Sequence, residues 1–336
     1  MKKNKRLVKM TKVEYIKRMF FLLGFLVLLP LAVSYPQNKE QKKITFLPSW
    51  VPQSQFAGYY MAKEKGIYEK YGLDVTIMTG GYTHDVITSL KSGESDFGVL
   101  FLYTGIMERV NGTKIVNIGQ IFQRSGIMFV AKKKSCINTL KDFNGKKIGV
   151  WRTVATELTT GFLKKHNIHA EIVPFNNAIN IFLNDAVDIT IMMNYNEYKR
   201  LINSGINPDE INIFNFYDYG MNFPEDGIYC METTFKSDPE VCRKFVEASI
   251  EGWTYALANT EETLDVIQKI KESAKVPSDR SHSHWMLNCM NDMIYSSNKN
   301  VKEGNLLESD FDYVSNFLYE NKFITSKPLY DDFYKR

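Results

Sequence analysis

The sequence predicts an α/β protein of two lobes, with a hinge and a ligand cleft between them. Apolar, strand-like runs alternate with segments of helical periodicity over residues 44–132, and the same rhythm restarts after a polar turn at 140–147. Past residue 231 the pattern is helical alone. A chain that leaves one lobe, builds another and returns must cross twice, so we expect crossing segments near 124–132 and 222–232 to form a hinge.

The first lobe is expected to hold residues 35–131 and 222–336. Its strands are short apolar runs bounded by turns, at residues 44–47, 73–77, 97–102, 115–122 and 126–132. Helices are expected from residue 54, from Thr83 as a cap, and from Tyr103, and this βαβ rhythm favours parallel pairing. The trailing helices are expected to begin at Asp238-Pro239, where Asp caps and Pro takes the first turn, and near Thr260, Asp279 and Ser309.

The second lobe is expected to hold residues 132–221. Its strands are predicted at 148–151, 171–173, 187–193 and 211–216, and its helices at 154–166, 177–184 and 197–203. Since ligands collect in loops at the carboxyl ends of strands in open α/β sheets, those loops are the first place to look for a site.

Charge along the chain separates an amino-terminal segment from the rest. The protein has 336 residues and a formal charge of +4, but residues 1–34 hold eight Lys or Arg and one acid, a net +7, so the remainder carries −3. A mildly acidic body gives no support for nucleic-acid binding. The length suits two domains, and 44% hydrophobic residues suit a globular protein.

The amino-terminal segment has the pattern of a secretory signal peptide over residues 1–34. A basic region leads into about fifteen apolar residues ending at Ala32-Val33-Ser34, which is short for a membrane-spanning helix of roughly twenty residues. We therefore expect export to the periplasm or another extracytoplasmic space. An uncleaved signal anchor is the alternative, and translation could also start at Met10 or Met19.

No motif for hydrolytic or redox chemistry is present. The sequence has no G-x-S-x-G, H-E-x-x-H, Walker or G-x-G-x-x-G motif, and its four cysteines show neither a C-x-x-C pair nor zinc-ligand spacing. Buried apolar thiols are the favoured interpretation, although an exported protein could form a disulfide. We expect no catalytic residue, no metal and no cofactor.

Aromatic residues beside polar groups recur where the predicted strands end. Trp50 follows the first strand in a loop that also holds Gln53, Phe56 lies at the start of the helix that comes next, and Trp151 ends the first strand of the second lobe. The same pairing occurs at Tyr82, at Tyr103, at Tyr195-Asn196-Glu197 and at Asp218-Tyr219. Ring faces supply stacking, while carboxylates and amides accept hydrogen bonds from ring N–H groups. The pattern favours a flat, heteroaromatic ligand.

With these residues assembled, the chain resembles substrate-binding proteins of the NMT1/THI5-like group, which serve ABC-type import. The matching segments are WVPQSQFAGYYMAKEKGIY at 50–68, GLDV at 72–75, SGESDFG at 92–98, LKDFNGKKIGVW at 140–151, YNEY at 195–198, DYGMNFPEDG at 218–227 and EGWTYA at 251–256. The resemblance implies a periplasmic binding protein-like fold of type II, in which two α/β lobes close over a small ligand and deliver it to a membrane permease and its ATPase.

The group includes proteins that bind pyrimidine precursors of thiamine, and the resemblance implies a similar ligand here. Trp50 and Tyr60 would contact the ring, Glu197 would hydrogen-bond a pyrimidine edge, and Tyr195 and Asp218 would support it. The expected ligand contacts are therefore Trp50, Gln53, Phe56, Tyr60, Tyr82, Trp151, Tyr195, Glu197, Asp218 and Tyr219.

Three alternatives to the pyrimidine ligand are kept. One is another small ligand, such as a sulfonate, a flavin or another nitrogen heterocycle, and one is a membrane-anchored ligand sensor. The third is a pyrimidine synthase like the fungal relatives, which use an active-site His and a Cys-rich metal-binding run. Neither the matching His nor the Cys-rich run is found here. Pro52 is followed by Gln53-Ser54-Gln55-Phe56, where pyrimidine-binding relatives often carry Asn and His.

Overall fold

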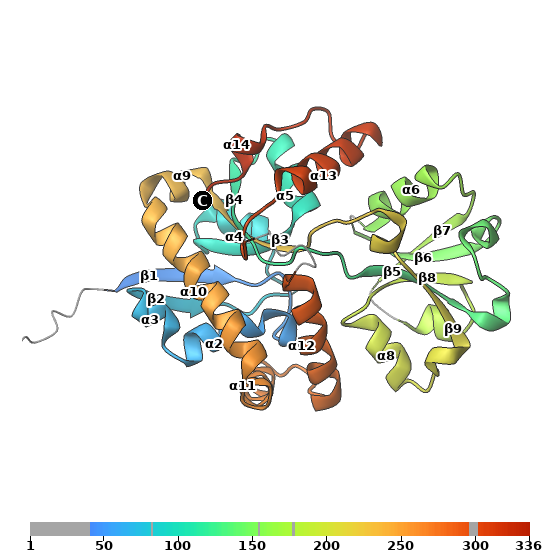
Figure 1. Ribbon diagram of the computed structural model, residues 1–336, viewed down its shortest axis with the longest axis horizontal. Helices are drawn as coiled ribbons and strands as arrows, with labels where there is room; N and C mark the ends of the chain where they lie inside the picture. Colours follow the sequence, from blue (N-terminus) through green and yellow to red (C-terminus); the bar gives the residue numbers. More distant parts are fainter. Residues whose placement is uncertain (1–40, 82, 154, 177–178, 296–301) are drawn as a thin grey trace, which may run out of the picture. The chain divides into compact units, whose positions relative to one another are not determined.

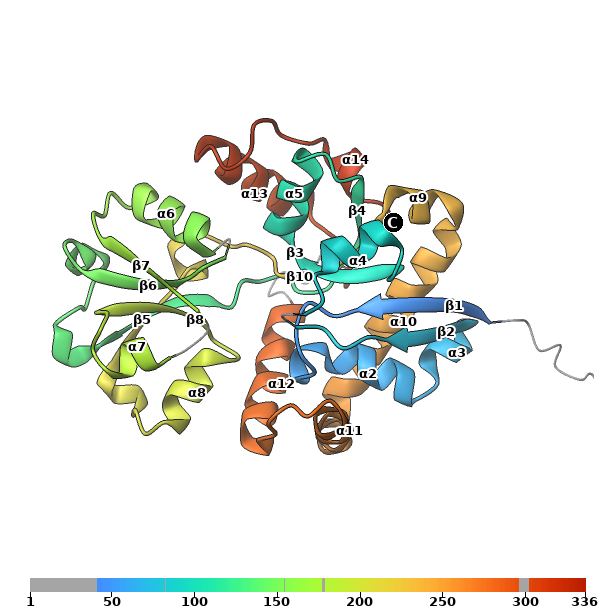
Figure 2. The same ribbon diagram turned by 180° about the vertical axis from the view of Figure 1, so that it is seen from behind.

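Two five-stranded sheets carry the fold in the computed structural model (Figure 1). The structure describes residues 41–81, 83–153, 155–176, 179–295 and 302–336. The expected signal peptide at 1–34 and the candidate contact Tyr82 lie outside these ranges. Each sheet, with its helices, forms one of the two α/β lobes that the sequence predicts, and Figure 2 shows both from behind.

The first sheet has the strand order β2-β1-β3-β10-β4. β1 pairs in parallel with both β2 and β3, whereas β10 lies antiparallel between β3 and β4. Apolar residues that are buried on both faces explain the central position of β3, whose first four residues are fully enclosed. The strands are β1 (Lys42–Leu47), β2 (Leu73–Ile77), β3 (Phe97–Phe101), β4 (Ile115–Gln120) and β10 (Asp226–Met231).

The second sheet repeats this plan with the order β7-β6-β8-β5-β9. β6 pairs in parallel with β7 and β8, and β5 lies antiparallel between β8 and β9. In each sheet, therefore, the antiparallel strand is the one that enters from a crossing segment. The strands are β5 (Ile127–Lys132), β6 (Lys147–Trp151), β7 (Glu171–Phe175), β8 (Ile189–Met193) and β9 (Ile211–Asn215).

The structure corrects the expected boundary between the lobes. Residues 127–131 were assigned to the first lobe, but they form β5 of the second sheet, so the first crossing lies before Ile127. Parallel pairing throughout the first lobe was also wrong, because β4 pairs only with the antiparallel β10. Strand order depends on contacts that are distant in the sequence, and hydrophobic periodicity carries no information about them.

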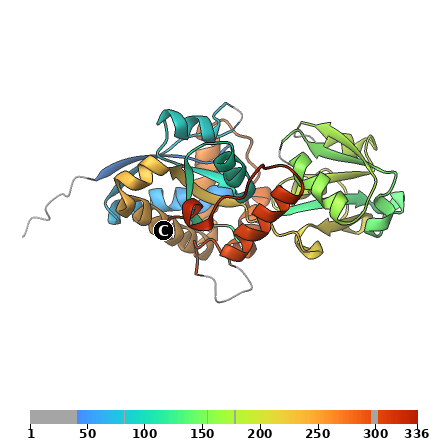
Figure 3. The same cartoon turned by 90° about the horizontal axis from the view of Figure 1, so that it is seen from above.

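The helices of the first lobe come from both ends of the described chain. α10 packs on α2 and α3, and α13 packs on α5 (Figure 3). The helices are η1 (Ser54–Phe56), α2 (Ala57–Glu64), α3 (Ile67–Lys70), α4 (Val86–Ser92), α5 (Leu102–Val110), α9 (Glu232–Ser237), α10 (Pro239–Ala258), α11 (Thr260–Ser273), α12 (Arg280–Ile294), α13 (Glu308–Glu320) and α14 (Tyr330–Phe333).

The helices of the second lobe are shorter, with only α6 longer than two turns among the described residues. They are η2 (Lys133–Ser135), η3 (Leu140–Phe143), α6 (Ala155–Lys165), α7 (Asn180–Leu183), α8 (Glu197–Asn203), η4 (Pro208–Glu210) and η5 (Tyr217–Tyr219).

One of the two helix caps named from the sequence is confirmed, and a further cap forms at the expected helix start near Asp279. The Asp238 side chain accepts from Val241 N at the start of α10, and that of Asp279 accepts from His282 N at the start of α12. The expected cap at Thr83 was wrong: Asp85 caps α4 by accepting from Thr88 N at 2.8 Å. Asp is among the strongest N-caps because its carboxylate satisfies an orphan N–H and favours the positive helix end.

Most of the large aromatic side chains belong to the cores. In the first lobe Phe245 of α10 contacts Phe46 and Phe97, with ring centroids 5.2 and 4.5 Å apart, and stacks on Tyr68 at 5.3 Å. In the second lobe Phe129 is enclosed by three further phenylalanines, Phe143, Phe162 and Phe216. Such pairs add to the stability that area burial provides.

Two further findings concern the helices and the cysteines of the described residues. None of their helices has the length and apolar character that a membrane crossing requires. Their cysteines are all free thiols: Cys136 is exposed, Cys289 is half-buried, and Cys230 and Cys242 are buried.

The close approach of α2 and α10 requires glycine at position 252. A Cβ at Gly252 would overlap the carbonyl oxygen of Gly58 and the Ala62 side chain, both on α2. Backbone atoms cannot move aside cheaply, so we expect Gly252→Ala to lower the free energy of unfolding by about 1–3 kcal/mol in urea denaturation. Thr254→Ala, on the exposed face of the same helix, is the matched control and should change stability by about 0.5 kcal/mol or less. Equal stability of the two variants would contradict the packing argument.

Candidate functional site

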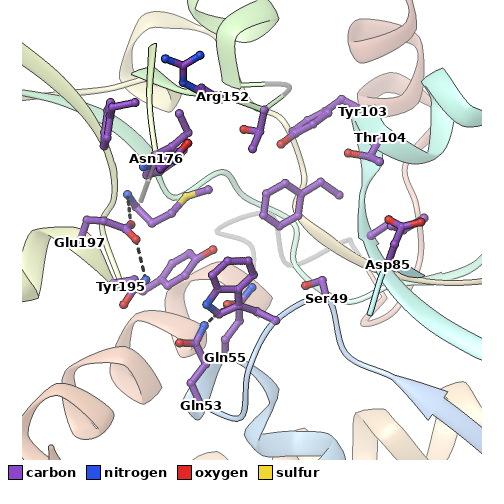
Figure 4. A pocket seen from close by; sticks show the side chains of 18 residues that line it. Ser49, Gln53, Gln55, Asp85, Tyr103, Thr104, Arg152, Asn176, Tyr195 and Glu197 are labelled. Carbon is purple, nitrogen blue, oxygen red and sulfur yellow. Dashed lines mark hydrogen bonds between the residues drawn. The ribbon is translucent and has the colours of Figure 1, made fainter. Parts of the chain in front are cut away.

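A cavity lies where the two lobes face each other (Figure 4). Its volume is about 530 Å³, and its walls come from both lobes. The first lobe contributes Ser49, Trp50, Gln53, Gln55, Asp85, Leu100, Phe101, Tyr103 and Thr104. The second contributes Trp151, Arg152, Thr153, Phe175, Asn176, Met193, Tyr195, Asn196 and Glu197.

The lining residues sit at or just beyond the carboxyl ends of six parallel strands. In the first lobe these are β1, β2 and β3, and in the second they are β6, β7 and β8. Loops and helix starts at these ends leave side chains and backbone N–H groups free to meet a ligand, which is the general arrangement of sites in open α/β sheets. The cavity is therefore where the strand-end pattern led us to look.

Five of the expected contacts line this cavity, and they are Trp50, Gln53, Trp151, Tyr195 and Glu197. Four do not, namely Phe56, Tyr60, Asp218 and Tyr219. Phe56 and Tyr60 are buried beneath η1 and α2 in the core of the first lobe. Asp218 is exposed and accepts from Asn215, while Tyr219 packs against Phe162, His166 and Phe214.

The sheet order explains the position of Asp218 and Tyr219. They follow β9, which is the edge strand and is separated from β8 by the antiparallel β5. β9 runs in the same direction as β8, so its carboxyl end lies at the same edge of the sheet, but the width of β5 keeps Asp218 and Tyr219 away from the cavity. For Phe56, the short helix η1 turns the ring inward, and Gln53 and Gln55, which precede it, line the cavity instead.

The sequence analysis did not select several polar lining residues, chiefly Gln55, Asp85, Thr104, Arg152 and Asn176. Arg152 and Asn176 each directly follow a strand residue, so extending the strand-end rule by one position would have found them. Asp85 would have been found as the cap of α4. Thr104 lies within α5 and had no distinctive signal.

Glu197 shapes the wall of the second lobe through its own hydrogen bonds. Its carboxylate accepts from Met193 N at 3.1 Å and from Asn196 Nδ2 at 2.8 Å, which closes the loop between β8 and α8. Burial raises the pKa of Glu197, and its hydrogen bonds to the backbone act in the opposite direction. The remaining lone pairs of this carboxyl group are available at the cavity wall.

Trp151 presents an unused hydrogen-bond donor. Its indole Nε1 is buried and has no partner among the described residues, although the ring lines the cavity. By contrast, the indole of Trp285 on α12 donates to the carbonyl of Asn194 at 2.9 Å. Because an unpaired buried donor costs free energy, an acceptor on a bound ligand would relieve this cost at Trp151.

Two buried carboxyl groups stand behind the cavity wall at the second crossing. Gln53 Nε2 donates to Gln55 Oε1 at 2.6 Å, and Gln55 Nε2 donates to Asp226 Oδ2 at 2.9 Å. From the other lobe, the Tyr195 hydroxyl donates to Glu225 at 3.0 Å. Burial raises the pKa of Glu225 to about 8 and that of Asp226 to about 7, and the charge of Asp226 adds to the shift of Glu225.

The fold and the site together define the class of protein to which this chain belongs. Two α/β lobes, each with an antiparallel strand supplied across the crossing and with a cavity at the facing strand ends, form the periplasmic binding protein fold of type II. The crystal structure of the periplasmic aliphatic sulphonate binding protein SsuA from Escherichia coli has the same fold: it superposes with a TM-score of 0.67 at 13% identity, covering 85% of this chain and 94% of that one.

The chain belongs to the NMT1/THI5 like family, whose model matches residues 53–263, more than half of the chain. The riboflavin-binding protein RibY of Chloroflexus aurantiacus is 27% identical over 69% of this chain and 68% of that protein. The formylaminopyrimidine-binding protein of Halalkalibacterium halodurans is 22% identical over 71% and 74%.

The family also contains proteins that are named as enzymes. The 4-amino-5-hydroxymethyl-2-methylpyrimidine phosphate synthase THI11 of Saccharomyces cerevisiae is 22% identical over 65% of this chain and 68% of that protein. Membership of the family therefore leaves the choice between binding protein and enzyme to the residues of the site.

The buried carboxyl pair predicts how stability depends on pH. Glu225 and Asp226 keep their protons in the folded chain up to about pH 7–8, whereas unfolded carboxyl groups lose them near pH 4. The unfolded state thus binds fewer protons in this window, so the free energy of unfolding should fall as pH rises from 5 to 8, by up to about 1.4 kcal/mol per pH unit for each retained proton.

Urea denaturation at pH 5, 6, 7 and 8 measures this slope. The double variant Glu225→Gln/Asp226→Asn has no proton to lose at either position, so its slope should be flatter than that of the wild type. The same slope in both proteins would show that the pair does not retain its protons.

Proposed function

We propose that this chain is the extracytoplasmic substrate-binding protein of an ABC importer and captures a small heteroaromatic ligand. The cavity carries the proposal: aromatic rings from both lobes surround a space of about 530 Å³ at the facing strand ends. That volume lies within the roughly 300–1,000 Å³ typical of small-molecule sites. Membership of the NMT1/THI5 like family supports it.

The lining residues suit a planar ring that carries both donors and acceptors. Trp50, Trp151 and Tyr195 offer ring faces, and the unpaired Trp151 N–H would donate to a ring nitrogen or carbonyl oxygen. Glu197 would accept from an amino group or a ring N–H. Gln53 donates its amide N–H to Gln55, which leaves its carbonyl oxygen for the ligand.

Our first candidate ligand is a pyrimidine precursor of thiamine. The relative named as a formylaminopyrimidine-binding protein supports this choice, since its alignment spans 71% of the chain. A pyrimidine with an exocyclic amino group would match the Glu197 acceptor and the Trp151 donor on one edge. Lobe closure would be needed to enclose so small a ring.

A flavin is the second candidate. RibY, named as a riboflavin-binding protein, is a relative over a similar span. The isoalloxazine ring is larger than a pyrimidine and carries carbonyl and N–H groups along one edge. Several aromatic residues from both lobes, Phe101, Tyr103 and Phe175 among them, line the cavity in addition to the two tryptophans, which favours a ligand with a broad face.

The residues at the cavity argue for binding without chemistry. None of the described lining residues is His or Cys, the residue types on which the synthase hypothesis depends. A sulfonate would use hydroxyl and guanidinium donors such as Ser49, Thr104 and Arg152, and it would be repelled by Glu197.

Isothermal titration calorimetry of the chain with formylaminopyrimidine, hydroxymethylpyrimidine, riboflavin and an alkanesulfonate tests the proposal. We expect binding of a heterocycle and a loss of about tenfold or more in affinity for Trp151→Ala, since base–aromatic stacking contributes about 1–3 kcal/mol. Tyr319→Ala, at an exposed ring outside the cavity, is the control and should bind like the wild type.

The variant Glu197→Gln distinguishes the ligand classes. It should lower the affinity for a ligand that donates a hydrogen bond to the carboxylate, and the affinity for a sulfonate should stay equal or rise. No heat with any of the heterocycles would remove the ligand assignment. Release of a phosphorylated pyrimidine product would instead establish the synthase alternative.

Delivery to a permease and export of the chain are part of the same proposal. The basic and apolar segment at 1–34 supports export through a cleaved signal peptide, with a signal anchor as the alternative. Mass spectrometry of the mature protein distinguishes them, because cleavage after Ser34 leaves Tyr35 as the amino terminus.

A further inference from the structure

Glu225 and Asp226 lie where the second crossing segment enters β10, and each touches a different lobe. Asp226 Oδ2 accepts from Gln55, which lines the cavity from the first lobe. Glu225 Oε2 accepts from the Tyr195 hydroxyl, which lines it from the second lobe. The two adjacent carboxyl groups thus connect cavity residues that come from opposite walls.

The pair also fastens the two crossing segments to each other. Glu225 Oε1 accepts from Gly126 N at 2.5 Å on the first crossing and from the Ser125 hydroxyl at 3.4 Å. On the same segments, Asn222 accepts from Ser125 N and donates to the carbonyl of Gln123. Any change in the angle between the two lobes must move these segments, so the pair lies at the hinge.

Among the residues that the structure describes, neither carboxyl group has a cationic partner. Both residues are fully buried, and their partners are amides, hydroxyls and backbone N–H groups. Asp226 Oδ1 is buried and has no partner among the described residues. The titratable groups around the pair are the hydroxyls of Tyr59 (α2), Tyr103 (α5), Tyr195 and Tyr229 (β10), with Glu157 and Glu197 beyond them. All of these are acids.

We propose that Glu225 and Asp226 are positioning residues of the binding site, which hold Gln55 and Tyr195 in place while both carboxyl groups keep their protons. Asp226 Oδ1 can carry its proton while Oδ2 accepts from Gln55. Loss of a proton from either group places a negative charge in a fully buried site that has no cationic partner among the described residues, and this charge is relieved only if the crossing opens and the two cavity residues move. This inference rests on the proposed function, since it concerns the affinity of that cavity.

The ligand-free chain gives the first test. With ¹³C-labelled tyrosine and ¹⁵N-labelled glutamine in the full chain, the Tyr195 ring and the Gln55 side-chain amide should titrate together with a midpoint near pH 7–8. The double variant Glu225→Gln/Asp226→Asn has no titrating proton at either position, so both resonances should lose this titration. Resonances that do not move between pH 6 and pH 9 in the wild type would overturn the proposal without reference to any ligand.

Ligand affinity gives the second test, with riboflavin and formylaminopyrimidine as the probes. For whichever binds, the Kd of the wild type should rise by about threefold to tenfold from pH 6 to pH 9, because one fully linked proton gives about a factor of ten per pH unit. In the double variant Glu225→Gln/Asp226→Asn the Kd should lose this dependence on pH. A wild-type Kd that is constant with pH, or an unchanged slope in the variant, would refute the inference.

A matched control is Asp310→Asn on α13, since burial also raises the pKa of that carboxyl group and it lies outside the cavity. It should keep the full pH dependence of the wild type. If neither probe binds, the ligand assignment fails, while the resonance titration still decides whether the pair positions Gln55 and Tyr195.

Discussion

The double crossing of the chain is the constraint on which the rest of this structure depends. Because β10 returns to the first sheet and β5 enters the second, each sheet contains one antiparallel strand that fixes where the crossing segments must run. The three parallel strands of each sheet then end at the same space between the lobes. The cavity is a consequence of this connectivity, and its chemistry is whatever residues follow those six strands.

The crossing segments leave backbone polar groups that need hydrogen-bond partners. Two backbone segments without mutual strand pairing must satisfy their N–H and C=O groups by other means. Side chains do so here: Gln120 donates to the carbonyl of Glu225 at 2.7 Å, and Asn222 bonds both ways to the first crossing. The polar residues that satisfy the backbone here also place carboxyl groups in a buried environment, where their charged forms are disfavoured.

Local features of the sequence could predict the elements and part of the site. Alternation and helical spacing located the strands and helices, and capping chemistry located the start of α10, because both signals act between residues near in sequence. Sheet order depends on distant residues. This is why the sequence pattern placed residues 127–131 in the wrong lobe and Asp218 and Tyr219 at the cavity, although the intervening strand β5 separates these two residues from it.

The aromatic residues show why composition alone cannot identify a site. Phe56 and Trp50 are six positions apart in the sequence, yet the first belongs to the core and the second to the cavity wall. The backbone separates them, because η1 carries Phe56 into the core while Trp50 follows β1 at the cavity. The Trp285 indole has its partner within the protein, whereas the Trp151 indole has none among the described residues. An unpaired donor or acceptor at a cavity specifies which complementary atom a ligand must have. Such groups therefore constrain the identity of the ligand more closely than ring stacking does.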